Sequence, residues 1–152
     1  MIRLTLVALV IASGAQAACR DDVVELRGEW GSARFTVDVA DEPDERSQGL
    51  MNVPEMAASR GMLFIYDAPQ RATFWMENTL IPLDMIFAAP DGTVTHVHEN
   101  AVPLDRTIID GGQGVQYVLE INGGLSSRIG IGVGDALRHP GIDQEAAVWP
   151  CD

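Results

Sequence analysis

Short apolar segments separated by turn residues constrain the fold of this chain more than any other feature. The clearest pair spans residues 83–89 and 93–98, with Asp91-Gly92 between them. Asp-Gly is a strong signal of a tight hairpin, because a two-residue hairpin turn needs positive φ angles that these residues accept. We therefore expect the two segments to be strands that pair antiparallel.

Alternation of apolar and polar side chains marks a further strand at residues 34–39, and it is typical of a strand with one buried face. Asp41 and Pro43 then favour the start of a short helix that ends near Gly49. Other strands are predicted at residues 62–66, 71–76, 115–121 and 136–137, and other short helices at residues 55–58 and 125–129.

Together these elements predict a mostly β fold, namely a compact, single-domain β sandwich or barrel with short helices inserted after the first strands. Apolar residues make up 47% of the chain, which is enough for a real core. A nucleotide-binding sheet is disfavoured. The glycine-rich stretch at residues 111–114 leads into a strand, whereas a phosphate cradle leads into a helix.

The N-terminus has the pattern of a secretory signal peptide. Arg3 precedes an apolar run at residues 4–12, and Ala-Gln-Ala at residues 15–17 then places small residues around a larger one. The apolar run is about half of the roughly 20 residues that a membrane-spanning helix needs. We expect cleavage near Ala17, which leaves residues 18–152 as one β-rich domain, periplasmic or secreted, without a membrane span.

The two cysteines of the chain, Cys19 and Cys151, then lie close to the two ends of the mature protein. In an exported protein such a pair favours a disulfide bond. Two alternatives remain open at this point. Cys19 follows an apolar run and is a candidate for lipid attachment, although Gln16 stands where an aliphatic residue is expected, and both thiols can also stay free.

The net charge of the chain argues against some classes of binding partner. The chain has 10 basic and 22 acidic residues, which gives a net charge of −12. An excess of acidic groups repels the phosphates of nucleic acid and anionic membrane surfaces. We therefore predict a small molecule or an envelope polypeptide as the partner, and no nucleic acid. The oligomeric state does not follow from the sequence.

Five blocks of sequence stand out in order between about Arg34 and Leu137. They are Glu45-Arg46 with Gly49-Leu50-Met51, then Gly61-Met62-Leu63-Phe64, Phe74-Trp75-Met76-Glu77-Asn78-Thr79, Ile81-Pro82-Leu83-Asp84 and Tyr117-Val118-Leu119-Glu120. This string of blocks resembles the bacterial and archaeal family called domain of unknown function 192. The resemblance implies a mostly β single domain, often exported, with no established biochemical activity. The chain departs from the family at Glu77, where a lysine is usual.

The densest group of polar and aromatic residues predicts a candidate ligand site formed by Arg46, Trp75, Asn78 and Asp84. Tryptophan offers a stacking face, asparagine both donates and accepts hydrogen bonds, and arginine with a carboxylate orients a polar ligand. The alternative is structural: Asn78 and Asp84 flank Pro82, and such residues often close turns through side-chain to backbone hydrogen bonds.

His96 and His98 lie two residues apart in a predicted strand, so they share a face and form a candidate site for a divalent metal. The segment supplies no third ligand, and two solvated surface histidines are the simpler interpretation. We therefore predict no cofactor and keep a divalent metal as the alternative.

No serine lies in a nucleophile-elbow sequence, and both thiols are expected to be bridged. The leading hypothesis is therefore an exported binding or accessory module of the bacterial envelope. The rival hypothesis is a hydrolytic enzyme. It would use either the two histidines with a metal or three acidic residues that converge, namely Glu45, Asp84 and Glu120.

Overall fold

The computed structural model describes residues 18–151, and the predicted signal peptide lies outside this range. Within these residues no helix combines the length and the apolar character that crossing a bilayer requires. The elements follow one another as β1 (Val23–Gly28), β2 (Gly31–Ala40), α1 (Pro43–Gln48), β3 (Arg60–Gln70), β4 (Thr73–Phe74), β5 (Leu83–Ala88), β6 (Val94–Ala101), β7 (Ile109–Asp110), β8 (Val115–Asn122), α2 (Leu125–Ile129) and β9 (Ala136–Arg138).

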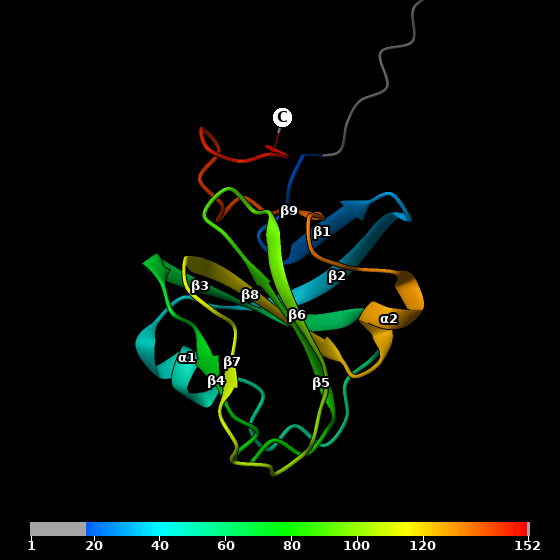
Figure 1. Ribbon diagram of the computed structural model, residues 1–152, viewed down its shortest axis with the longest axis vertical. Helices are drawn as coiled ribbons and strands as arrows, with labels where there is room; N and C mark the ends of the chain where they lie inside the picture. Colours follow the sequence, from blue (N-terminus) through cyan, green and yellow to red (C-terminus); the bar gives the residue numbers. More distant parts are fainter. Residues whose placement is uncertain (1–17, 152) are drawn as a thin grey trace, which may run out of the picture.

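Seven of these strands form one curled sheet in the order β6-β5-β8-β3-β2-β1-β9, so the fold is a half-barrel and the prediction of a mostly β fold is confirmed (Figure 1). The strands β2 and β3 pair in parallel, and all other neighbours in this sheet are antiparallel. A parallel pair needs a crossover connection, and that connection contains α1. A separate ribbon of β4 and β7 lies beside α1.

The predicted hairpin around Asp91-Gly92 is present, since β5 and β6 pair antiparallel on either side of it. The helix predicted at residues 55–58 is absent. Residues 55–57 are irregular and a turn begins at Ala58, while the carbonyl of Met56 accepts a hydrogen bond of 2.6 Å from the side chain of Asn122. A single helical turn is costly to nucleate, so this tertiary hydrogen bond outweighs the local preference.

Alternation along the central strands gives the sheet two apolar faces. Leu63, Leu119 and Ile121 belong to a cluster on the first face, where β1 and β2 contribute further apolar side chains. Phe64 and Val118 belong to a cluster on the second face, which faces α1 and the β4–β7 ribbon. Because both faces are packed, a polar side chain in β5, or at residues 117–121 of β8, is buried whichever way it points.

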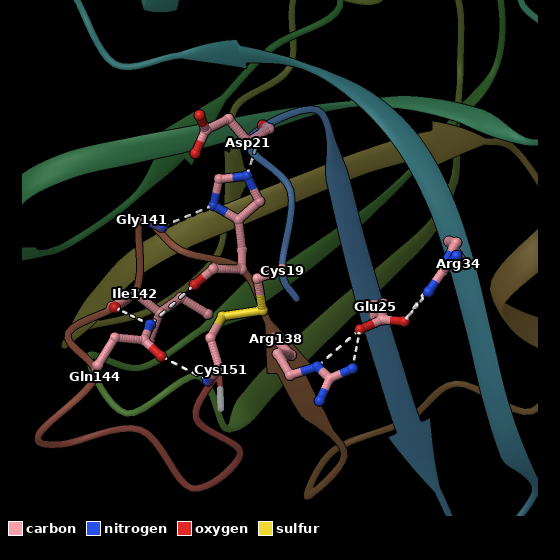
Figure 2. Close-up of a disulfide and its surroundings, with 10 residues drawn as sticks. Cys19, Asp21, Glu25, Arg34, Arg138, Gly141, Ile142, Gln144 and Cys151 are labelled. Carbon is pink, nitrogen blue, oxygen red and sulfur yellow. Dashed lines mark hydrogen bonds and ion pairs between the residues drawn. A yellow bond between two sulfur atoms is a disulfide. The ribbon is translucent and has the colours of Figure 1, made fainter. Parts of the chain in front are cut away.

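The predicted disulfide is present and joins Cys19 to Cys151, with their Cα atoms 5.6 Å apart (Figure 2). The backbone N–H of Cys151 also donates a 2.6 Å hydrogen bond to the side chain of Gln144. On the same side, a ring nitrogen of His139 lies 2.8 Å from the carbonyl oxygen of Asp21. The two ends of the described chain are thus held together by a covalent bond and by polar contacts.

Candidate functional site: a pocket beside Glu120

A pocket of about 210 Å³ lies between the second face of the sheet, the end of α1 and the segment around β4. We call it the Glu120 pocket. Its lining combines four aromatic rings with Arg46, Glu120 and four uncharged polar residues. The lining residues are Arg46, Ser47, Gln48, Gly49, Leu50, Met51, Phe64, Tyr66, Thr73, Phe74, Trp75, Thr79 and Glu120.

The loop that follows α1 can lie directly on the core because it contains a glycine. Gly49 has a φ of 49°, in the left-handed region, and a Cβ atom at this position would lie 3.2 Å from the ring of Phe64. Any other residue here would have an unfavourable backbone conformation, and its Cβ atom would also crowd the ring of Phe64. The sequence Gly49-Leu50 thus allows a close wall of the pocket.

Glu120 is the polar group buried most deeply in the pocket. It lies on β8 opposite Met85 of β5, and only 4% of its surface is exposed. No other described residue forms a hydrogen bond or an ion pair with its carboxyl group, and neither oxygen is sealed off from the pocket space. Burial alone raises the pKa of Glu120 to about 8, so the side chain is a neutral acid at neutral pH.

This burial predicts a dependence of stability on pH. The pKa of Glu120 is higher in the folded protein than in the unfolded chain. The contribution of its protonation to the free energy of unfolding is therefore fully present at low pH and is lost as the pH rises toward about 8. Relative to a Glu120→Gln variant, the wild type should lose about 2 kcal/mol of unfolding free energy between about pH 5.5 and pH 7.5. Urea unfolding of both proteins across this range measures the difference, and parallel pH profiles would contradict the assignment.

Arg46 and Tyr66 form the polar wall next to Glu120. The guanidinium of Arg46 donates hydrogen bonds to the carbonyls of Asp41 and Ile65, the latter at 2.9 Å, and lies 5.4 Å from the centre of the Tyr66 ring. Burial raises the pKa of Tyr66, the charge of Arg46 opposes this, and the charge of Glu120 adds to it. Tyr66 therefore lies within the electrostatic reach of both charged groups.

The aromatic wall consists of Phe64, Phe74 and Trp75 together with Tyr66. Phe64 and Phe74 meet edge to face with their ring centres 5.1 Å apart, which is a favourable geometry for two aromatic rings. Trp75 is 41% exposed, and the guanidinium of Arg106 lies 5.5 Å from the centre of its ring. The indole is thus a partly open surface at the edge of the pocket.

The structure brings two of the four predicted site residues into this pocket, Arg46 and Trp75, and places the other two elsewhere. Asn78 is exposed in the turn after β4, where it has a φ of 53° and its carbonyl accepts a hydrogen bond from the N–H of Asn52. Asparagine tolerates this left-handed conformation better than most residues.

Asp84 is completely buried on the first face of the sheet. Its carboxylate accepts hydrogen bonds from the backbone N–H groups of Asn100, Gly124 and Ser126 at 2.8 to 2.9 Å, and from the hydroxyl of Ser126 at 2.6 Å. These four bonds join β5 to the end of β6 and to the start of α2. The structural interpretation of Asp84 is the one that this geometry favours.

The three carboxylates of the rival hydrolytic hypothesis do not share a cavity. Asp84 pairs with Ile121 and Met85 pairs with Glu120, so the side chains of Asp84 and Glu120 leave opposite faces of the sheet. Glu45 is exposed on α1, where its side chain accepts hydrogen bonds from the backbone at the start of the helix. Of the three, only Glu120 lines the pocket.

His96 and His98 of β6 lie opposite Phe87 and Met85 of β5, respectively. The two histidines are therefore on one face of the sheet, as their spacing predicts. The ring of His96 stacks on Phe87, with a centre-to-centre distance of 5.6 Å. Asp110, which could serve as a third ligand, forms an ion pair with Arg71. Within residues 18–151, no three His, Cys, Asp or Glu side chains are grouped so that they could hold a metal ion.

Sequence reasoning did not place Tyr66 in a site, and it treated Glu120 only as one member of a set of carboxylates. The signal for Glu120 is nevertheless present. It is the one acidic residue in the segment Val115–Ile121, which otherwise consists of apolar residues, Gln116 and Tyr117. An ionisable group in a strand buried on both faces is a candidate for function.

Comparison with known proteins identifies the family. The family model for DUF192, described as "Uncharacterized ACR", matches residues 23–139. No protein with a curated description matches the chain. A crystal structure of a protein of unknown function from Novosphingobium aromaticivorans DSM 12444 is similar, with 37% identity and a TM-score of 0.74, over 86% of this chain and 98% of that one.

A second crystal structure, of a Sinorhizobium meliloti 1021 protein called a "putative transcription regulator", is 41% identical to this chain with a TM-score of 0.77. The match covers 84% of this chain and 99% of that one. The segment that the family model matches, residues 23–139, contains every strand of the curled sheet and every residue of the Glu120 pocket. The chain therefore belongs to the DUF192 family, a family of unknown function.

Proposed function

We propose that the protein is an exported, single-domain binding module of the bacterial envelope, which holds a small ligand in the Glu120 pocket after removal of residues 1–17. The observation that carries the proposal is a buried carboxyl group without a partner in a cavity of about 210 Å³. Buried polar groups in folded proteins are almost always hydrogen-bonded, so an unpaired one that opens onto a cavity indicates a ligand.

The composition of the lining supports a binding function. Four aromatic rings supply apolar contact area, and polar groups that can orient a ligand come from Arg46, Tyr66 and Glu120 and from four uncharged side chains, Ser47, Gln48, Thr73 and Thr79. Small-molecule sites in proteins also combine aromatic contact surface with polar groups that fix the orientation of the ligand. The cavity of about 210 Å³ is smaller than the roughly 300 to 1,000 Å³ of sites for drug-sized ligands, so it suits a smaller molecule, for which we propose an amino acid or a monosaccharide as the upper size.

Nucleic acid is not part of the proposal, although the name of the Sinorhizobium relative includes transcription. The net charge of −12 opposes the binding of phosphate backbones. The disulfide supports an oxidising compartment, since disulfides persist outside the cytoplasm and are rare within it. Export and a periplasmic or secreted location are therefore part of this proposal.

The three tryptophans make the proposal testable by NMR of the indole N–H groups. Trp75 borders the pocket, and the indole of Trp30 donates a 2.7 Å hydrogen bond to Asp135. The guanidinium groups of Arg27 and Arg138 lie 4.4 Å and 4.5 Å from the centre of the Trp149 ring. A panel of amino acids, amines, sugars and carboxylic acids at millimolar concentration should contain a class that shifts the Trp75 signal alone. A Trp75→Phe variant assigns that signal.

A ligand found in this way should bind about tenfold more weakly to Trp75→Ala, because the truncated side chain removes the stacking surface at the edge of the pocket. Trp149→Ala is the matched control, and its affinity should equal that of the wild type. A panel that leaves the Trp75 signal unmoved, or that moves all three indole signals equally, would sink the proposal.

A further inference from the structure

The charges and rings of the Glu120 pocket also indicate a class of ligand. We propose that the pocket binds a primary ammonium group, with Glu120 as its counter-ion and with the rings of Tyr66 and Trp75 beside it. This inference rests on the proposed function, because it names the chemistry of the ligand that the same pocket would take.

The first argument is the incomplete state of Glu120. A buried carboxylate is stabilised in proteins by a cation or by several hydrogen-bond donors, and Asp84 of this chain has four such donors. Glu120 has none among the described residues. An ammonium group brings a positive charge and three N–H donors, and so supplies what this carboxyl group lacks.

The second argument is the ring of aromatic side chains. A cation is attracted to the face of Trp, Tyr or Phe when it lies within about 6 Å of the ring centre. Two rings of this pocket already attract guanidinium groups, because Arg46 lies 5.4 Å from Tyr66 and Arg106 lies 5.5 Å from Trp75. The same rings border the space in front of Glu120.

The third argument concerns the other charges around the pocket. Among the lining residues only Arg46 of α1, Tyr66 of β3 and Glu120 of β8 carry titratable groups. The guanidinium of Arg46 is held by the carbonyls of Asp41 and Ile65, and burial alone accounts for the raised pKa of Glu120. Arg46 therefore does not neutralise Glu120. The net charge of −12 further draws cations toward the protein.

The test compares two probes of nearly the same shape, benzylammonium and benzyl alcohol, in NMR titrations that follow the Trp75 signal. The wild type should bind benzylammonium at least tenfold more tightly, because only this probe forms a charge-assisted hydrogen bond with Glu120. In Glu120→Gln the preference should vanish, with benzyl alcohol bound as in the wild type. Glu99→Gln, an exposed charge change on β6, is the matched control and should keep the wild-type affinities.

A second readout is independent of affinity. Glu120 is protonated at neutral pH and must ionise to pair with an ammonium group, so binding should release about one proton. Calorimetry at about pH 7 in two buffers of different ionisation enthalpy measures this release. The wild type should release the proton, and Glu120→Gln should release none.

The outcomes separate the two proposals. Equal binding of both probes, or a preference for benzylammonium that survives in Glu120→Gln, would overturn the ammonium inference and leave the pocket as a binding site. If both probes leave the Trp75 signal unmoved, the inference also falls, and the proposed function is then decided by the wider panel. Selective binding with proton release, lost together in Glu120→Gln, would establish both.

Discussion

Replacing both cysteines, Cys19→Ser with Cys151→Ser, should lower the free energy of unfolding by about 5 kcal/mol, the largest effect expected for this chain. The disulfide joins residues 132 positions apart, so it removes much of the conformational freedom of the unfolded chain. Urea unfolding of the wild type and of the double variant, both without reductant, gives the difference in the free energy of unfolding.

The control for this prediction is the response to a reductant. Reduction should destabilise the wild type to the level of the double variant and should leave the double variant unchanged. The intact mass of the oxidised wild type should be about two mass units lower than that of the reduced form, which confirms that the bond is closed. If the free energies of unfolding of the double variant and of the wild type differ by less than about 1 kcal/mol, the prediction is contradicted.

Asp84→Ala should lower the free energy of unfolding by about 4 kcal/mol. The substitution leaves three backbone N–H groups and the hydroxyl of Ser126 without their acceptor in a buried site, and each unsatisfied group costs about 1 to 3 kcal/mol, with the sum reduced by relaxation. Ser126→Ala removes one of the four bonds and should cost about 1 to 2 kcal/mol.

Asp38→Ala is the matched control for Asp84→Ala. The carboxylate of Asp38 lies 3.1 Å from the guanidinium of Arg60, but both side chains are largely exposed. A surface ion pair of this kind contributes at most about 1 kcal/mol, so the control should stay close to the wild type. Equal effects of Asp38→Ala and Asp84→Ala in chemical unfolding would show that the carboxylate of Asp84 does not hold these segments together.

Most of the fold could be predicted from local patterns. The hairpin at Asp91-Gly92 follows from turn chemistry, and the strands β2, β5 and β8 follow from apolar alternation and apolar runs. The segment 71–76, predicted as one strand, is a strand only at Thr73–Phe74, and no local pattern predicts its partner β7. These two-residue strands are too short to show a period, and they exist because Thr73 pairs with Asp110. Such pairing depends on tertiary contacts and not on either segment alone.

The site could be predicted only in part, and the reason is the register of the sheet. Asp84 and Glu120 both lie in family-like segments, and the sequence does not say which face of the sheet each one meets. The pairing of β5 with β8 sends Asp84 to the first face, where backbone donors satisfy it, and Glu120 to the second, where none do. Arg46 and Trp75 reach the pocket because α1 and β4 cover that second face.

The bond between Cys19 and Cys151 closes residues 19–151 into a covalent ring. An endoprotease that cuts this ring once, for instance at the exposed residue Gln113 between β7 and β8, converts it into one chain with new ends and does not release a fragment. A single cut therefore leaves both parts of the domain in one covalently joined molecule. The same geometry favours circular permutants that join residues 19 and 151 through a short linker and begin at residue 114.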